Sequence, residues 1–207
     1  VVITQIAGAS GARCRIYIDG QFAFVLYKGE LRKFHLQEGQ ELPPDSYREI
    51  TEELLPRRAK LRCMNLLQSK DYTRKQLEDK LAQGEYPQEC IDEAIAYVES
   101  YGYLDDLRYA RDYIEYHIDS RSRNRIEQDL LRKGIDRATL ERAWAKWEEQ
   151  GGSQDETSMV RALLKKRGYD TENAEIRERQ KAYAFLIRKG FSGETIRKVL
   201  KAEDIEA

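Results

Sequence analysis

The sequence has few of the residues that build metal sites and disulfide frameworks. Its 207 residues include three cysteines and two histidines, and Cys14, Cys63 and Cys90 lie far apart with no CxxC pair. A structural zinc site needs four such ligands close together, and an odd number of cysteines argues against a disulfide framework. The sequence therefore predicts no metal, no cofactor and reduced thiols of the kind found in the cytoplasm.

Long apolar runs and an excess of charge of one sign are also missing. No run approaches the roughly 20 apolar residues that a membrane-spanning helix requires, and no signal peptide opens the chain. The first residues are Val1-Val2-Ile3 rather than methionine, which indicates that the natural sequence begins further upstream. With 36 basic and 37 acidic residues, the formal net charge is −1. We therefore expect no membrane association, and the overall charge demands no nucleic-acid partner.

Recognisable catalytic motifs are absent as well. The sequence contains no GxGxxG or GxxxxGK[ST] phosphate-binding loop, and His35 and His117 have no serine or cysteine at a familiar spacing. Trp144 and Trp147 stand three residues apart on one predicted helix. Core packing is favoured for them over stacking on a nucleic-acid base. These absences favour a protein that binds over one that catalyses.

The N-terminal part of the chain has the pattern of a small β unit. Residues 13–26 alternate polar and apolar side chains around Asp19-Gly20. This dipeptide is a strong hairpin signal, because both turn positions need a positive φ. Val1–Ile6 is predicted to add a third strand, and Gly29 is expected to interrupt the chain after the hairpin. Residues 1–44 are therefore predicted to form a β unit that leans on the next segment of the chain.

The pattern becomes helical from Asp45 onward. Asp45 and Ser46 are predicted N-caps of a connecting helix over residues 45–56, and Pro56 is expected to restart the chain as a separate helix. In that next helix, Leu61 and Leu66 are predicted to face the core beside Met64 and Leu67. Thr73 is predicted to cap the helix after it.

The helical pattern then repeats. LLRKGIDRATL at residues 130–140 aligns without a gap with LIRKGFSGETI at residues 186–196. Such units bury their apolar faces mainly within themselves and against neighbours. The predicted fold is mainly α, with three tandem three-helix repeats in an elongated array preceded by the small N-terminal β-hairpin unit. The repeats are expected at residues 57–105, 106–152 and 153–207.

The segment GYLDDLRYA, residues 102–110, carries two adjacent carboxylates, Asp105 and Asp106. A two-metal site built on a YxDD turn would need a β-hairpin and a further acidic residue, whereas this segment is predicted to be helix–loop–helix. Gly102 is predicted to end one helix, and Asp105 or Asp106 to cap the next. A polar contact with a partner is the other interpretation of the pair. The remaining motif residues are predicted to pack at the junction or on the inner face of the next helix: Tyr103, Leu104, Tyr109 and Ala110. We therefore predict no catalytic residues and no enzyme.

Basic residues recur where the second helix of each repeat begins or ends. From Val160 to Lys201 there are twelve Lys or Arg residues against five Asp or Glu residues. Such a stripe suits DNA phosphates or acidic patches on a protein filament, whereas solvated helix faces with i,i+4 ion pairs are the alternative. Recurrence of Arg132-Lys133 as Arg188-Lys189 favours binding. The candidates for contact with a partner or DNA are Arg74, Lys75, Arg121, Arg123, Arg125, Arg132, Lys133, Lys165, Lys166, Arg167, Arg188 and Lys189.

The junction motif and the repeats together resemble the RecX family of bacterial regulatory proteins. The resemblance covers Arg57–Ile205, and the N-terminal β unit suits the longer members. The residues that match the family's most typical signature are Gly102, Tyr103, Leu104, Asp105, Asp106, Tyr109 and Ala110. A second match is formed by Arg125, Ile126, Leu130, Lys133, Gly134 and Ile135.

The resemblance implies regulation of the RecA recombinase. Members of the family bind the RecA–DNA filament, lie in its groove, and suppress ATP hydrolysis, strand exchange and filament growth without chemistry of their own. It implies RecA and single-stranded DNA as partners of a cytoplasmic monomer, with a role in DNA repair, recombination and the SOS response. The alternative from another class is an autonomous nucleic-acid-binding helical protein that inserts a helix into the major groove.

Overall fold

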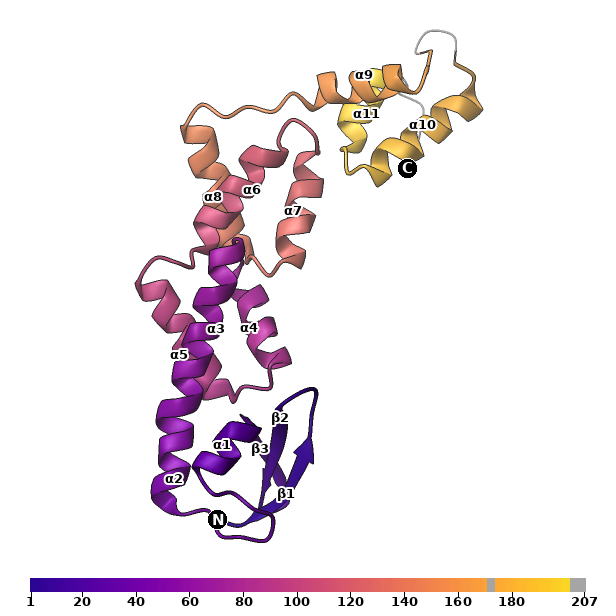
Figure 1. The fold of residues 1–207 in the computed structure, drawn as a ribbon. Coiled ribbons are helices and arrows are strands. Elements are labelled where there is room, and N and C mark those ends of the chain that lie inside the picture. The colour runs from indigo at the N-terminus through magenta and orange to yellow at the C-terminus, as the bar shows by residue number, and fades with distance from the viewer. Residues whose placement is uncertain (171–173, 202–207) are drawn as a thin grey trace. The chain divides into compact units, whose positions relative to one another are not determined.

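The computed structural model describes residues 1–170 and 174–201, and the chain divides into two compact units, Val1–Asp105 and Asp106–Ala207 (Figure 1). The N-terminal unit begins with an antiparallel sheet in the order β1-β2-β3. Its strands are β1 (Ile3–Gly8), β2 (Arg13–Ile18) and β3 (Gln21–Tyr27). The predicted hairpin is confirmed, because Asp19 and Gly20 join β2 to β3 with φ values of 50° and 83°.

A short helix, α1 (Lys28–Lys33), follows the sheet where the sequence analysis expected an interruption at Gly29. That expectation was wrong. The carboxylate of Glu30 accepts a hydrogen bond from the backbone N–H of Tyr27 at 2.7 Å. This contact satisfies a donor at the start of the helix, so the glycine in the first turn does not prevent it.

The predicted break at Pro56 is also wrong. Three helical segments follow each other without a gap: α2 (Pro44–Arg48), the π-helical η1 (Glu49–Leu54) and α3 (Leu55–Ser69). The change of hydrogen-bond pattern falls just before Pro56, the residue that has no N–H to donate. Asp45 and Ser46 do not cap this helix, because Pro43 occupies the N-cap position and Pro44 already lies in the first turn.

The first three-helix repeat is completed by α4 (Arg74–Gln83) and α5 (Gln88–Ser100). The predicted cap at Thr73 is confirmed: its hydroxyl accepts from the Gln76 N–H at 3.2 Å, and the Gln76 side chain accepts from the Thr73 N–H at 3.1 Å. Leu61 was wrongly predicted to face the core, since it is 52% exposed. Leu66, Met64 and Leu67 pack against the core as predicted, and Ala59 and Cys63 are the fully buried residues of the inner face of α3.

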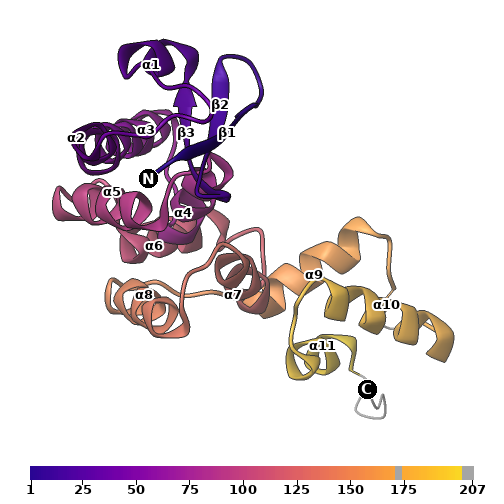
Figure 2. The same ribbon diagram turned by 90° about the horizontal axis from the view of Figure 1, so that it is seen from below.

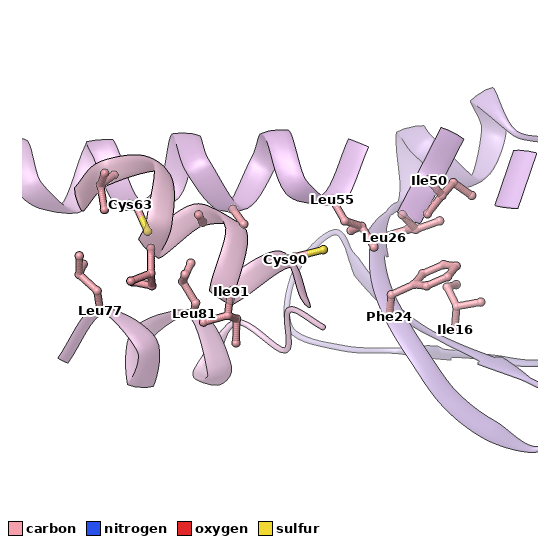
Figure 3. Packing of buried hydrophobic residues seen from close by; sticks show 14 of the residues in the cluster. Ile16, Phe24, Leu26, Ile50, Leu55, Cys63, Leu77, Leu81, Cys90 and Ile91 are labelled. Carbon is pink, nitrogen blue, oxygen red and sulfur yellow. The ribbon is translucent and has the colours of Figure 1, made fainter. Parts of the chain in front are cut away.

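One hydrophobic core joins the sheet to these helices (Figure 3). Leu26 of β3 lies beside Leu55 at the start of α3, and Phe24 of the same strand belongs to the same cluster (Figure 3). Leu77 and Leu81 of α4 belong to the same cluster and are fully buried. The β segment is therefore part of the core of the N-terminal unit.

Within residues 106–170 and 174–201, the C-terminal unit has two separate hydrophobic cores. One core is built by α6 (Asp106–His117), α7 (Arg123–Arg132) and α8 (Arg137–Glu149). The other is built by α9 (Glu156–Lys166), α10 (Ile176–Arg188) and α11 (Gly193–Leu200), which are coloured orange to yellow in Figure 2. Residues 171–173 and 202–207, which the third predicted repeat includes, lie outside the described residues, and the repeat boundaries themselves stay predictions.

The gapless match between the second and third repeats corresponds to one local structure. Gly134 and Gly190 end α7 and α10 with φ values of 89° and 88°. Two residues later, Asp136 caps α8 by accepting from the Thr139 N–H at 2.8 Å. Ser192 caps α11 in the same way, accepting from the Thr195 N–H at 3.1 Å. The aligned apolar residues are buried as predicted: Leu130, Leu186, Ile135, Phe191, Leu140 and Ile196.

Candidate partner-binding surface

The GYLDD motif ends α5 and leads into α6. Gly102 has a φ of 68°, and its N–H donates to the Glu99 carbonyl at 2.9 Å, as predicted for a C-terminal glycine. Leu104 is buried in the N-terminal core, whereas Tyr103 is half exposed and stacks on Tyr101 with 5.9 Å between ring centroids. Since α6 begins at Asp106, the acidic pair lies at a helix start, and its capping role stays a prediction.

The last two motif residues lie on α6. Ala110 is fully buried in the core of the second repeat, and Tyr109 packs against that core while partly exposed. Both therefore face inward, as predicted. No group of three potential metal-ligating side chains occurs within residues 1–170 and 174–201.

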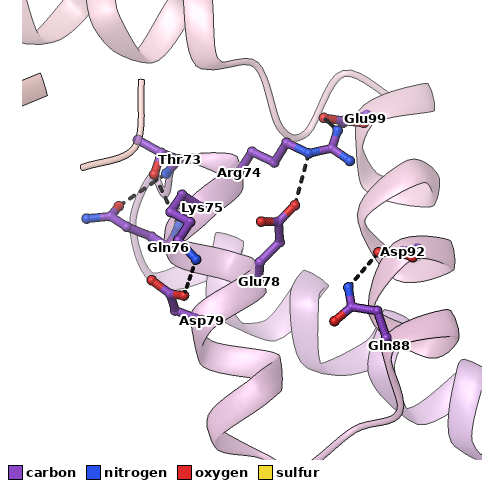
Figure 4. A network of polar contacts seen from close by, with 9 residues as sticks. All are labelled: Thr73, Arg74, Lys75, Gln76, Glu78, Asp79, Gln88, Asp92 and Glu99. Atoms are coloured by element: carbon purple, nitrogen blue, oxygen red, sulfur yellow. Dashed lines mark hydrogen bonds and ion pairs between the residues drawn. The ribbon is translucent and has the colours of Figure 1, made fainter. Parts of the chain in front are cut away.

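Arg74 and Lys75, the first basic candidates, take part in ion pairs on the surface of the first repeat (Figure 4). Arg74 contacts Glu78 at 3.0 Å and Glu99 at 2.6 Å, and Lys75 contacts Asp79 at 2.8 Å. The hydrogen bond to Asp79 raises the pKa of Lys75. These contacts favour the alternative of paired charges on a solvated helix face for both residues.

Four other candidates, which come from two different repeats, line a single cavity in the C-terminal unit. This cavity has a volume of about 570 Å³, and its lining includes Arg121 from the loop before α7, Arg125 from the first turn of α7, and Arg188 and Lys189 from the end of α10. Phe185 forms part of its apolar wall. The structure thus brings together cations that are far apart in the sequence, and we call this site the basic cavity.

Asp129 orients the arginines on the α7 side of the basic cavity. Its carboxylate is buried, and it contacts Arg121 at 2.8 Å, Arg125 at 3.3 Å and Arg132 at 3.7 Å. Arg121 also donates to the Tyr113 hydroxyl at 2.7 Å. One carboxylate is shared among several guanidinium groups, so the basic cavity keeps an excess of positive charge.

Ser122 and Gly190 hold the two sides of the basic cavity together. The buried Ser122 hydroxyl donates to the Lys189 carbonyl at 3.0 Å and accepts from the Arg125 N–H at 3.3 Å. A Cβ atom on Gly190 would lie 2.6 Å from that hydroxyl oxygen, which is closer than real Cβ contacts come. Glycine is therefore needed here both for the positive φ and for the close approach of the two repeats.

The remaining candidates lie outside the basic cavity. Arg123 pairs with Glu127 at 3.1 Å and Glu148 at 2.8 Å, and its guanidinium lies 4.3 Å from the centre of the Trp144 ring. Arg167 lies 4.1 Å above Phe185. Arg132, Lys165 and Lys166 are exposed, while Lys133 lies over the rings of two tyrosines of α6. Trp144 is buried in the core, as predicted, and Trp147 packs against it.

Sequence reasoning missed three residues that shape the basic cavity: Ser122, Asp129 and Phe185. Ser122 carried a usable signal, because a serine directly before a helical run is a typical N-cap. Asp129 also carried one, since it stands four residues after Arg125 and three before Arg132. Phe185 of α10 lies four residues before Lys189, so its place beside that lysine follows from helix spacing, whereas its place in one cavity with Arg121 and Arg125 depends on tertiary packing.

The arrangement can bind anions, because guanidinium groups and an ammonium group surround an open cavity with an apolar wall. Among the residues that the structure describes, no helix is both long enough and apolar enough to span a bilayer. The basic cavity contains no histidine, cysteine or carboxylate along its lining. Its guanidinium and ammonium groups are suited to negatively charged ligands.

Comparison with known proteins places this architecture in a family. The models described as the first, second and third three-helix domains of RecX match residues 59–97, 105–143 and 154–200. The chain is 30% identical to "Regulatory protein RecX" of Caldanaerobacter subterraneus subsp. tengcongensis over 186 residues, covering 89% of this chain and 90% of that protein. It is 29% identical to the protein of the same name from Clostridioides difficile, covering 91% of this chain and 88% of that protein.

Solved structures give the same result. One described as "Crystal structure of regulatory protein RecX" has a TM-score of 0.62 and 26% identity, and the match covers 98% of this chain and all of that one. RecX from Lactobacillus salivarius has a TM-score of 0.56 and 23% identity, with 72% of this chain and 97% of that one covered, and so shares the fold. With three domain models matched in order and relatives aligned over nearly their whole length, this chain belongs to the RecX family of regulatory proteins.

Proposed function

We propose that this protein binds the RecA–DNA filament in the cytoplasm and inhibits RecA ATPase activity, strand exchange and filament growth. Membership of the RecX family supports a regulatory role. The observation in this chain that best supports an anionic filament as the partner is the basic cavity, to which two three-helix domains each contribute two cations. We expect the protein to act without catalysis and as a monomer.

The charges of the basic cavity support this proposal. Asp129 is shared by the arginines of α7, whereas Arg188 and Lys189 are exposed and have no ion pair within residues 1–170 and 174–201. Cations of this kind release counterions when they meet DNA phosphates, which makes binding depend on salt. Leu163, Phe185 and Phe191 add apolar surface to the lining of the basic cavity.

The test is the rate of DNA-dependent ATP hydrolysis by RecA, measured with increasing amounts of this protein. We compare two double variants. The cavity variant carries Arg188→Gln and Lys189→Gln, and the matched control carries Arg74→Gln and Lys75→Gln. Each variant loses one arginine and one neighbouring lysine, but the control pair already contacts carboxylates of its own repeat. The cavity variant should need about tenfold more protein for half inhibition, and the control should inhibit nearly as well as the unchanged protein.

The salt dependence gives a second measurement. For single-stranded DNA, each lost phosphate contact should reduce the slope of log affinity against log salt concentration by about 0.7. The cavity variant should therefore show a shallower slope than the control. Equal inhibition and equal slopes for the two variants would contradict a role of the basic cavity in binding.

Autonomous binding of nucleic acid is the second candidate function, since the basic cavity would also suit the phosphates of naked DNA. The two candidate functions predict different relative affinities for RecA-coated and naked single-stranded DNA. A filament regulator should bind RecA-coated single strands far more tightly than the same strands without RecA. Equal affinity for coated and naked DNA, with no effect on RecA ATP hydrolysis, would favour the autonomous binder.

A further inference from the structure

The N-terminal unit contains a second concave basic site. A cavity of about 320 Å³ lies between the sheet and the first helical repeat. Its lining includes Arg13 and Tyr27 from the sheet, Arg58 and Arg62 from α3, Lys80 from α4 and Tyr86 from the loop before α5. None of these residues was among the sequence candidates, and none belongs to the basic cavity of the C-terminal unit. We call this site the sheet–helix cavity.

Part of the positive charge in the sheet–helix cavity is neutralised within the protein. Glu85 contacts Arg13 at 3.3 Å and Arg15 at 2.6 Å, and Arg58 forms an ion pair with Glu30. Arg13 also donates to the Gly84 carbonyl at 2.8 Å. These contacts fix the guanidinium groups of Arg13 and Arg58 along the wall.

Arg62 and Lys80 add positive charge that the ion pairs of Glu85 and Glu30 do not neutralise. Neither forms an ion pair within residues 1–170 and 174–201, and Lys80 reaches only the side-chain oxygen of Gln83 at 3.5 Å. Five cations at and beside the sheet–helix cavity thus face two carboxylates. A concave cluster with this excess concentrates anions.

The sheet–helix cavity also has aromatic walls. Tyr27 is 43% exposed, and the guanidinium of Arg58 lies 4.8 Å from the centre of its ring. The ring of Tyr86 is held against the chain, since a Cβ atom on Gly84 would lie 2.9 Å from it. Burial raises the pKa of the Tyr86 hydroxyl, while Arg58, Arg62 and Arg13 lower it, which indicates that this hydroxyl lies near the same cations.

We propose that the sheet–helix cavity binds one nucleotide, with its phosphate at Arg62 and Lys80 and its base against the ring of Tyr27. Phosphate needs donors with positive charge, and a base needs a flat face, which tyrosine and guanidinium groups both provide. An acidic protein segment would use the cations but would have no need of the tyrosine. The volume suits one nucleotide unit, either free or within a single strand.

The test is ultraviolet cross-linking of the full chain to a pentanucleotide that carries 5-iodo-deoxyuridine, followed by mass spectrometry of the peptides. We expect cross-links on the peptides that contain Tyr27 or Tyr86. Combining Arg62→Gln with Lys80→Gln should lower their yield about tenfold. Combining Arg32→Gln with Arg48→Gln, two exposed arginines of the same unit outside the cavity, should leave the yield unchanged.

A second arm uses 5-iodo-deoxyuridine monophosphate. Cross-linking of the same peptides at the same concentration assigns the sheet–helix cavity to a free nucleotide, whereas cross-linking by the pentanucleotide alone assigns it to a strand. Cross-links confined to other peptides, or a yield that the double variant does not change, would overturn the proposal. Loss of filament binding in that variant without any cross-link would also overturn it, and would assign the cavity to an acidic protein surface.

The proposed inhibition of RecA and this nucleotide site can fail separately. The variant that combines Arg188→Gln with Lys189→Gln should keep the cross-links to the peptides of Tyr27 and Tyr86. Conversely, an absence of cross-links in a protein that still inhibits RecA ATP hydrolysis would reject the nucleotide site alone.

Discussion

Replacing Ser122 with alanine should weaken partner binding at the basic cavity although it removes none of the cations there. The hydroxyl of Ser122 has two roles: it caps α7 through the Arg125 N–H, and it donates to the Lys189 carbonyl in the neighbouring repeat. Alanine removes both contacts and adds no bulk. The variant therefore tests whether the contacts between the second and third repeats, rather than charge alone, determine binding at the basic cavity.

The expected loss in the free energy of unfolding follows from these two contacts. Loss of an N-cap costs about 1 kcal/mol, and loss of a buried hydrogen bond costs about 1 kcal/mol more. We expect a total of about 2 kcal/mol in the free energy of unfolding. Ser192→Ala is the matched control, because Ser192 caps α11 through the Thr195 N–H and, among the described residues, its hydroxyl makes one other hydrogen bond, to the hydroxyl of the same Thr195. It should cost about 1 kcal/mol.

The assay is urea denaturation followed by circular dichroism. With a slope of about 2 kcal/mol per molar urea, Ser122→Ala should shift the midpoint by about 1 M and the control by about half as much. Binding to RecA-coated single strands, measured without urea, should fall in Ser122→Ala and stay unchanged in the control. Equal losses of stability and of binding in both variants would refute the idea that the contact between Ser122 and Lys189 determines the geometry of the basic cavity.

The other predictions concern the motif, the thiols and the response to pH. Combining Asp105→Asn with Asp106→Asn should lower stability in thermal unfolding by about 0.5–2 kcal/mol; a metal-dependent nuclease or phosphatase activity that this variant loses would contradict the non-catalytic assignment. Burial raises the pKa of Cys63 and Cys90 to about 11, so at pH 8 both thiols should resist Ellman's reagent until the protein is unfolded, and rapid labelling of the native protein would count against their burial. Burial lowers the pKa of His117 below 6.5, so the unfolded chain takes up this proton more readily and stability should fall as pH drops from about 7 towards 5. His117→Gln should reduce that dependence in urea titrations at several pH values, and an unchanged slope would show that another group is responsible.

Local signals in the sequence predicted the repeat structure well. The aligned segments 130–140 and 186–196 share one turn, with Gly134 and Gly190 at equivalent positions. Gly102 acts within one turn of chain, so its residue type revealed its role at the end of α5. The same holds for Thr73. Periodicity alone was weaker, and it misplaced Leu61 because α3 turns a stripe of smaller residues towards the core.

The candidate site could be predicted only in part. The sequence identified Arg121, Arg125, Arg188 and Lys189 as basic candidates, but it could not show that they share one cavity. That depends on how two repeats pack, and the contacts between them include the close approach at Gly190 and the hydrogen bond from Ser122 to the Lys189 carbonyl. The ion pair of Arg74 with Glu99 depends on tertiary structure too, since Glu99 lies on another helix, whereas its pair with Glu78 is an i,i+4 contact within α4.

The two separate cores of the C-terminal unit have a consequence for how this protein can change. Val160 and Leu186 belong to one core and Ile114 and Leu130 to the other, and the contacts that join the repeats include polar ones such as the hydrogen bond of Ser122. Effects of distant substitutions without shared partners add within about 0.3–0.5 kcal/mol. The effect of a core substitution on stability therefore depends on its own repeat and not on the core of the other. Selection can change the core residues of one repeat while those of its neighbour stay the same.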